Sequence, residues 1–268
     1  MHKKPIPRLG GLAIYGGFLC SILIFGQLDE TMLCVLLGAA IIVALGIFDA
    51  VLALGAKLKF VVQIVAAAIP VCIGDLQIGL FTNLNPLSDT PFVHLGILAV
   101  PVTIIWIVGI TNAVNLIDGL DGLAVGVSSI AAITMLAVAL LTGNMPIAIT
   151  MAALAGACIG FMPYNLNPAK IFMGDTGSLF LGGAVAGMAF ACDMPLILLL
   201  VGLIYIIETL SVILQVTYFK ATHGKRLFKM APIHHHFEMC GWGEKRIVLT
   251  FTAVTIVLCL AAYFVALP

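Results

Sequence analysis

Nine apolar runs follow one another along almost the whole chain, and each approaches the length that a helix needs to cross a membrane. The hydrocarbon core of a bilayer is roughly 30 Å thick, which corresponds to about 17 to 25 helical residues. Hydrophobic residues make up 62% of the chain and charged residues only 9%, whereas soluble domains carry about 25% charged residues. The sequence therefore predicts a polytopic membrane protein. The runs cover residues 9–26, 32–48, 60–72, 95–110, 123–141, 145–162, 179–191, 196–216 and 247–267.

The predicted fold is all-α, a transmembrane helical bundle that forms a single domain over residues 1–268. Backbone groups in lipid must be hydrogen-bonded within the protein, so only helices and closed barrels span a bilayer. The runs lack the two-residue alternation that barrel strands show, which leaves helices. Runs 60–72 and 179–191 are short, and we expect them to extend into their flanks or to lie buried among neighbouring helices.

The distribution of charge predicts the orientation of this bundle. Nine spans place alternate connections on opposite sides, and every Lys and Arg then falls on one side. By the positive-inside rule that side is cytoplasmic, so the N-terminus is expected inside and the C-terminus outside. A basic cytoplasmic face suits anionic substrates or anionic lipid. The basic side holds Lys3, Lys4, Arg8, Lys57, Lys59, Lys170, Lys220, Lys225, Arg226, Lys229, Lys245 and Arg246, and the other holds Asp29, Glu30, Asp75, Asp89 and Asp193.

The first two cytoplasmic connections carry carboxylates and carboxamides beside the spans. Asp49 and Ala50 end the second span, and Lys57 and Lys59 follow; a solvated carboxylate near two lysines is the simple alternative here. The fourth connection has more polar groups than a capped turn between two helices needs. In a helix, Asn112, Asn115 and Asp118 would share one face, and such a set can hold a polar head group or a hydrated cation. Asp121 follows in the same connection.

The sixth connection ends in Gly174-Asp175-Thr176-Gly177-Ser178, at the entrance of the seventh span. Free N–H groups at a helix N-terminus favour an anion, and a carboxylate favours a hard cation such as Mg²⁺. The sequence thus indicates a phosphate site with its metal, although an ordinary Thr or Ser N-cap has a similar pattern. Phe172 would stack on a base or anchor at the membrane interface.

The last cytoplasmic stretch, residues 218–246, is the longest and most basic, and it contains His234, His235 and His236. Three adjacent histidines cannot all face one ligand on a regular helix. A zinc site needs a more complete ligand set than this run supplies. Phosphate recognition by histidine with the nearby Lys and Arg is the favoured interpretation, and a patch for lipid head groups is the alternative.

Together these segments resemble the polyprenyl-phosphate N-acetylhexosamine-1-phosphate transferases, glycosyltransferase family 4, over essentially the whole chain. The stretches KKPIPRLGGLAIYGGF and NAVNLIDGLDGLAVGVSS have the style shared across that superfamily. The stretch QVTYFKATHGKRLFKMAPIHHHFEMCGWGEKRI is more specific and is similar to the bacterial phospho-N-acetylmuramoyl-pentapeptide transferases.

The resemblance implies a reaction at the cytoplasmic face of the cell membrane, the first membrane step of peptidoglycan synthesis. UDP-MurNAc-pentapeptide and undecaprenyl phosphate would give lipid I and UMP, with Mg²⁺ as cofactor. A long polyprenyl chain needs a membrane groove, and a polyanionic nucleotide needs a basic cytoplasmic mouth. Surrounding membrane lipid and a homodimer through membrane helices are further expected partners, and no nucleic acid is expected.

The same resemblance implies roles for individual residues. Asp175 would hold Mg²⁺ with Asn115, Phe172 would stack on uracil, and Asp121 would hydrogen-bond that base. The histidines would contact the pyrophosphate or the carrier phosphate. The expected catalytic residues are Asp49, Asp175, His234, His235 and His236, and the expected substrate-binding residues are Asn112, Asn115, Asp118, Asp121, Asn165, Phe172, Gln215 and Lys57.

Two departures from the family pattern affect these expectations. Family members carry ten spans, and KKPIPRLGG normally follows a first membrane helix, so this chain is expected to be a fragment or a short variant. The family also has an Asp-Asp pair after the second span seen here. Asp49 matches its first member, and Ala50 replaces the second. We expect strongly reduced turnover with surviving nucleotide binding.

Three rival interpretations stay open from the sequence. A transferase for N-acetylglucosamine 1-phosphate shares the superfamily motifs but not the HHHFE segment. A catalytically silent member would agree with Ala50. A secondary transporter would place ionisable groups near the midplane, and Glu208 is the one such residue within a run; a partner for a polar group on a neighbouring helix is its favoured interpretation.

Overall fold

The chain forms a bundle of helices in the computed structural model, which describes residues 6–82, 92–191 and 197–267. The predictions on Lys3, Lys4, Asp89 and Asp193 lie outside these residues. The helices are α1 Gly10–Phe25, α2 Glu30–Leu52, α3 Ala56–Cys72, α4 Ala99–Ile117, α5 Leu123–Leu141, α6 Met145–Asn165, α7 Gly174–Ala191, α8 Ile197–Val201, α9 Leu203–Ala221, α10 Ile233–Met239 and α11 Glu244–Val265.

Six helices of the described chain are long and apolar enough to cross a membrane. The helix α1 is apolar but shorter, with 16 residues. A multi-pass helical membrane protein is therefore confirmed, whereas nine spans and the side of each terminus stay predictions. The six are Glu30–Leu52, Gly96–Ile117, Leu123–Leu141, Met145–Asn165, Leu203–Ala221 and Glu244–Val265.

Local sequence accounts for where several helices begin. The side chain of Asp29 accepts a hydrogen bond from the Met32 amide at 2.7 Å and caps α2. Asn144 caps α6 in the same way. Short polar side chains satisfy amides that the first helical turn leaves without partners. Helix α5 coincides with the apolar run 123–141, because Gly122, with φ at +82°, ends the preceding turn.

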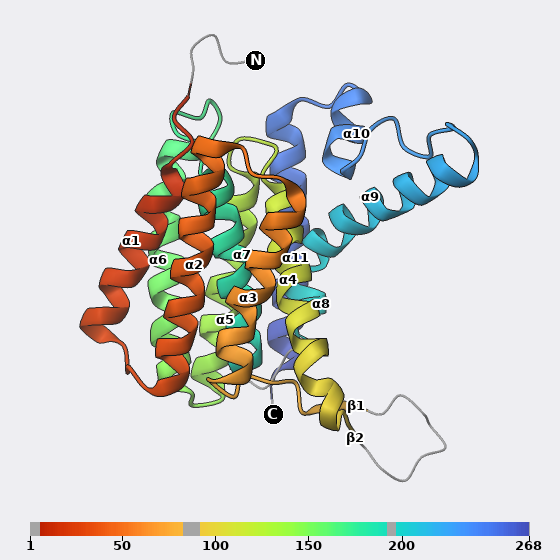
Figure 1. Cartoon of the computed structure of the whole chain (residues 1–268). Helices are drawn as coiled ribbons and strands as arrows, with labels where there is room; N and C mark the ends of the chain where they lie inside the picture. The colour runs from red at the N-terminus through yellow and green to blue at the C-terminus, as the bar shows by residue number, and fades with distance from the viewer. Residues whose placement is uncertain (1–5, 83–91, 192–196, 268) are drawn as a thin grey trace.

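The structure departs from the predicted elements in two places. The run 196–216 is not one helix: α8 and α9 meet at Gly202, and α9 leaves the bundle at an angle and continues to Ala221 (Figure 1). An antiparallel hairpin of β1 (Leu80–Thr82) and β2 (Phe92–His94) joins α3 to α4. Strands of three residues are too short for a periodic pattern to reveal them.

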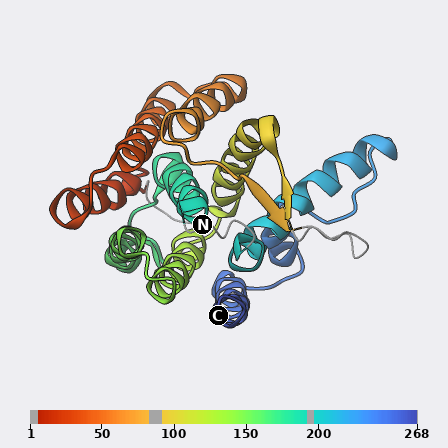
Figure 2. The ribbon, with the colours of Figure 1, turned by 90° about the horizontal axis from the view of Figure 1, so that it is seen from below.

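Helix α7 lies inside the bundle, against α1, α2, α4 and α5, as the view along the helices shows (Figure 2). Glycines allow two of these approaches. A methyl group on Gly46 of α2 would come within 2.8 Å of Thr176 Oγ1, and one on Gly11 of α1 would overlap the backbone of Gly177. These contacts bring the first turn of α7, with Asp175, next to the end of α2.

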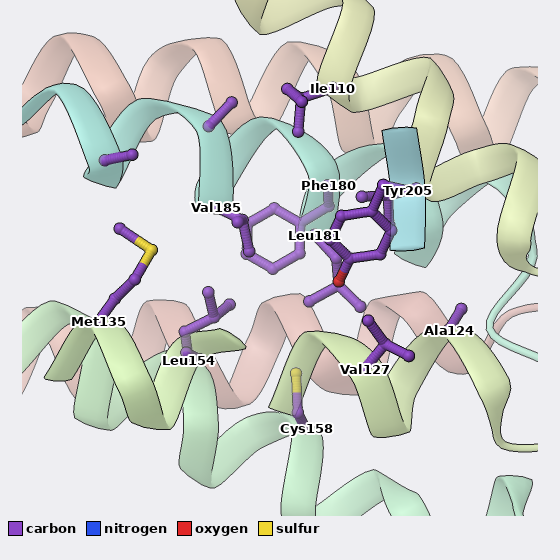
Figure 3. Close-up of a cluster of buried hydrophobic side chains, with 14 of the residues drawn as sticks. Ile110, Ala124, Val127, Met135, Leu154, Cys158, Phe180, Leu181, Val185 and Tyr205 are labelled. Atoms are coloured by element: carbon purple, nitrogen blue, oxygen red, sulfur yellow. The ribbon is translucent and has the colours of Figure 1, made fainter. Parts of the chain in front are cut away.

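The core below this end is apolar and closed. Phe180 of α7 and Tyr205 of α9 point into it between α4 and α5 (Figure 3). The Tyr205 hydroxyl lies 2.9 Å from Ser128 Oγ, so its buried polar group is satisfied. This contact ties the first turns of α9 to the bundle.

Candidate functional site

A pocket of about 840 Å³ opens at the end of the bundle where the four predicted cytoplasmic segments meet. Its lining combines side chains from α2, α3, α7, α10 and α11 with the α4–α5 turn, the α6–α7 connection and the segment before α1. The charged lining residues are Arg8, Asp49, Lys59, Asp118, Asp121, Asp175, Glu238 and Glu244. Among the described residues, six carboxyl groups thus line the pocket with two cations, so the basic mouth predicted for the nucleotide is locally acidic: most of the exposed lysines lie outside the pocket.

Lys59 connects two of the carboxylates. Its Nζ lies 2.9 Å from Asp49 Oδ2 and 3.0 Å from Asp175 Oδ2. Asp49 is in the last turn of α2, where its Oδ1 also accepts the Leu54 amide at 2.8 Å. The prediction of an Asp at a helix end is confirmed, and its lysine partner is Lys59.

Asp175 occupies the first turn of α7, as the Gly-Asp-Thr-Gly-Ser motif predicts. Asn115 of α4 donates its amide to Ser178 Oγ at 2.8 Å and to Asp175 Oδ1 at 3.3 Å. The side chain of Asp175 is 35% exposed. Its carboxylate is therefore held in place by Lys59 and Asn115 while it still faces the pocket.

Asp118 follows the last residue of α4 and lines the same pocket. Burial in the turn raises the pKa of its carboxyl well above the usual range, and the negative charge of Asp175 raises it further. The neutral acid is thereby favoured, and it can donate a hydrogen bond that a carboxylate cannot.

Asp121 and Asn165 line the pocket, but the structure also shows them holding its wall. Asp121 Oδ2 accepts the Ala169 amide at 2.9 Å, and Asn167 donates to Asp121 and to Glu244. Asn165 is 2% exposed, accepts the Gly122 amide and donates to the Ile171 carbonyl. These bonds join the α4–α5 turn to the α6–α7 connection. The predicted contacts of both residues with substrate stay predictions.

Two more predicted residues face a neighbouring groove of about 400 Å³ between α3 and α4. Lys57 lines it and is exposed. Asn112 lines it too, and donates to Gln63 Oε1 at 2.6 Å. Lys59 and Asp175 line both the groove and the pocket. The two spaces therefore meet at the Lys59–Asp175 contact.

The three histidines have three different surroundings. His234 is fully buried, with Nδ1 3.1 Å from Glu208 Oε2. His235 pairs with Glu238, and His236 accepts the Lys229 amide. None of the three is among the residues that line the pocket in the described part of the chain. Their expected contact with phosphate stays a prediction, whereas the interpretation of Glu208 as a partner for a polar group is confirmed.

Gln215 lies away from the pocket. Its Oε1 accepts the Leu227 amide at 3.1 Å and the Phe228 amide at 2.8 Å. It thereby holds the basic loop after α9 against that helix. Its predicted role in substrate binding is not supported by any contact with the pocket lining.

Sequence reasoning missed four charged residues of the lining as site residues: Arg8, Lys59, Glu238 and Glu244. Lys59 stands two residues after Lys57, and no sequence signal separates them. In the helix, however, only Lys59 faces Asp49 and Asp175. Arg8 stands two residues before α1, and Glu244 is the first residue of α11; this position at the start of an apolar helix is the one signal they share.

The donors at Asp175 suit a metal that needs few protein ligands. Among the described residues no group of three or more His, Cys, Asp or Glu side chains could hold a metal ion. Mg²⁺ is commonly bound by one or two carboxylates and takes its other ligands from water and phosphate. Asp175, exposed to an acidic pocket with Asn115 beside it, fits that requirement.

The comparison with known families agrees with the fold and the site. The family model of glycosyl transferase family 4 matches residues 32–193. These residues contain Asp49, Lys59, Asp118, Asp121 and Asp175. The chain, a helical membrane bundle with this pocket at one end, therefore belongs to glycosyl transferase family 4. It is an enzyme of the transferase class.

Individual relatives narrow the family further. A phospho-N-acetylmuramoyl-pentapeptide-transferase from Clostridium botulinum (strain Alaska E43 / Type E3) is 42% identical over 98% of this chain and 83% of its own length. One from Listeria monocytogenes serotype 4b (strain CLIP80459) is 42% identical over 96% and 83%. One from Clostridium perfringens (strain SM101 / Type A) is 53% identical over 64% and 53%. The chain belongs to the phospho-N-acetylmuramoyl-pentapeptide-transferase family.

Proposed function

We propose that this chain transfers phospho-MurNAc-pentapeptide from UDP-MurNAc-pentapeptide to undecaprenyl phosphate, giving lipid I and UMP at the cytoplasmic face of the cell membrane. The observation that carries the proposal is the meeting of the acidic pocket with the α3–α4 groove at Lys59 and Asp175. A soluble nucleotide sugar would enter the pocket from the aqueous end of the bundle. A prenyl phosphate would approach along the groove, where Phe60 and Leu179 are apolar lining residues.

Asp175, with Asn115, would hold Mg²⁺ in this site. When bound, the ion would polarise the diphosphate and disperse negative charge on the UMP leaving group. The protein's own groups would orient the reactants. Lys59 would stabilise a phosphate between the pocket and the groove, and Phe172, half-buried in the lining, would stack on the base. A neutral Asp118 would donate to a phosphate oxygen.

Ala50 is the departure that bears most on turnover. It lines the pocket next to Asp49 and presents a methyl group where the family pattern has a carboxylate. A methyl group cannot accept a proton or a hydrogen bond. We expect slow transfer by the unmodified chain and faster transfer by Ala50→Asp, with binding of the UDP-sugar similar in both.

The test is transfer of radiolabelled sugar phosphate to undecaprenyl phosphate in detergent with Mg²⁺, for the unmodified chain and for Ala50→Asp. UDP-MurNAc-pentapeptide and UDP-GlcNAc are offered separately. Lipid-linked muramoyl product from the unmodified chain supports the proposal, whereas product from Ala50→Asp alone would mean that the site is built for this reaction but that Ala50 inactivates it. Glucosamine product would move the chain to the other branch of the superfamily, and no product from either protein would contradict the proposed reaction.

Binding of the UDP-sugar distinguishes a slow enzyme, which still binds this substrate, from a protein that does not use it. Asp175→Ala removes the carboxylate expected to hold the metal and serves as the binding-deficient reference. If the unmodified chain binds the UDP-sugar no better than Asp175→Ala, the expectation that nucleotide binding survives with Ala50 is wrong.

A further inference from the structure

Arg8 is held at the rim of the pocket by its neighbours in the chain. Residues 7–11 run beside the stretch that leads into Asp175: the Phe172 amide donates to the Pro7 carbonyl at 2.8 Å, and the Gly10 amide donates to the Phe172 carbonyl at 3.0 Å. The Gly11 amide donates to the Met173 carbonyl at 3.0 Å. This backbone pairing fixes the position of Arg8 relative to Phe172 and Asp175.

Gly174 makes this close approach possible. The Arg8 carbonyl lies against its Cα, where a side chain would overlap, and Gly174 has φ at +64°. Glycine adopts that conformation without the strain other residues incur. The segment before α1 and the entrance of α7 are therefore fitted to each other, and Arg8 belongs to the wall of the pocket.

The two described cations of the pocket differ in what they already bind. Lys59 is engaged by Asp49 and Asp175. The guanidinium of Arg8 has no hydrogen bond or ion pair with any residue that the structure describes, although six carboxylates line the same space. Of the described cations that line the pocket, Arg8 is therefore the one whose side chain is available to an anionic ligand, which its positive charge would attract.

We propose that Arg8 binds a phosphate group of one of the two substrates. This rests on the proposed function, which supplies a nucleotide diphosphate and a prenyl phosphate as the anions. Arginine suits the task because its guanidinium stays charged and presents donors in a fork that matches phosphate oxygens. Lysine would keep the charge but not the fork.

The test is binding to the full chain in detergent with Mg²⁺, comparing the unmodified protein with Arg8→Ala and Arg8→Lys. The probes are uridine, UDP and geranylgeranyl phosphate. Arg226→Ala is the matched control, because it removes an exposed guanidinium whose described contact is the Lys229 carbonyl, outside the pocket. Thermal unfolding checks that each variant is folded, and little change is expected because the Arg8 side chain forms no hydrogen bond or ion pair with the described residues.

We expect Arg8→Ala to weaken the binding of one phosphate probe about tenfold to a hundredfold. Arg8→Lys should weaken the binding of that probe less, and uridine should bind equally well to all the variants. A loss for UDP assigns the nucleotide diphosphate as the ligand, and a loss for geranylgeranyl phosphate assigns the carrier. If the unmodified chain binds both probes and Arg8→Ala binds them equally well, the assignment of Arg8 is wrong while the proposed function stands.

Two other outcomes also contradict the assignment. An equal loss in Arg226→Ala would show a general effect of charge on this face instead of a contact in the pocket. Failure of the unmodified chain to bind UDP-MurNAc-pentapeptide and both phosphate probes would overturn the proposed function together with the role of Arg8.

Discussion

The ammonium group of Lys59 lies 3.0 Å from Asp175 Oδ2, although 116 residues separate the two in the chain. The same ammonium is 2.9 Å from Asp49 Oδ2. One cation thus holds together the end of α2 and the start of α7, at the point where the pocket meets the α3–α4 groove. Substitution of Lys59 therefore tests whether this contact organises the site.

Replacing Lys59 should slow transfer and change how the site binds metal. Lys59→Met leaves Asp49 and Asp175 close together without their shared counter-ion, so the free site becomes more negative. We expect transfer by the Ala50→Asp protein to fall at least about tenfold, and Mg²⁺ to bind more tightly. Transfer rate and Mg²⁺ titration measure the two effects. Lys245→Met, an exposed lysine outside the pocket lining, is the control, and a similar loss there would contradict a specific role for Lys59.

The carboxyl of Asp118 should make stability depend on pH. Its pKa is raised in the folded chain, so the folded state keeps a proton that the unfolded state loses above a pH of about 4. Stability is therefore greatest below that pH and falls as pH rises towards the folded-state pKa. Asp118→Asn should remove this decline and raise the melting temperature at neutral pH. Unfolding is followed from pH 4 to 8 in EDTA.

The control for this prediction is Asp75→Asn, because Asp75 is exposed and lies outside the pocket lining. It should leave the decline with pH unchanged. An Asp118→Asn protein that loses stability with pH as steeply as the unmodified chain would show that Asp118 is not the group responsible.

The buried pair of Glu208 and His234 should contribute more to the free energy of unfolding than the partly exposed pair of His235 and Glu238. Both side chains are fully buried, and a methyl group on Gly119 would come within 2.6 Å of His234 Nε2. His234 therefore packs against the turn that carries Asp118. Glu208→Leu or His234→Leu should cost about 1–3 kcal/mol of stability, since each leaves a buried partner without its hydrogen bond. Thermal or denaturant unfolding in detergent gives the values.

A neighbouring contact supplies the comparison. His235 and Glu238 form a pair whose side chains are 28% and 37% exposed, and such pairs contribute about 0–1 kcal/mol. Glu238→Leu should therefore change stability less than Glu208→Leu. Equal effects would mean that burial does not distinguish the two pairs.

Glycine packing between α1 and α7 gives a fourth prediction. Gly11→Ala places a methyl group against the Gly177 backbone, which cannot move as a side chain does, so we expect a loss of about 1–3 kcal/mol. Gly16→Ala on the same helix meets nothing within 4 Å. There alanine's helix propensity should leave stability unchanged or raise it by about 0.5–1 kcal/mol. The difference in melting temperature between the two variants measures how much the close contact of Gly11 with α7 contributes to stability. Equal melting temperatures would contradict this prediction.

Helix positions were largely predictable because they depend on local properties. The run 123–141 became α5 with the same bounds, and Gly174-Asp175 opened α7 as its composition indicated. The break at Gly202 was not predictable, because the apolar run continues through it without a change in hydropathy. The site was predictable as a set of segments but not as a set of contacts: Lys57 and Lys59 are equivalent in sequence, and helix geometry gives only Lys59 the carboxylate partners.

By itself the sequence determined that this is a multi-pass membrane protein, which segments carry polar chemistry, and to which family those segments are similar. Hydrophobic length and motif spacing are local quantities, readable in order along the chain. Tertiary structure alone decided that Lys59 joins Asp49 to Asp175, that His234 is buried against Glu208, and that Arg8 lines the pocket. These contacts join residues far apart in the chain, so they depend on how glycine-lined helices pack around α7.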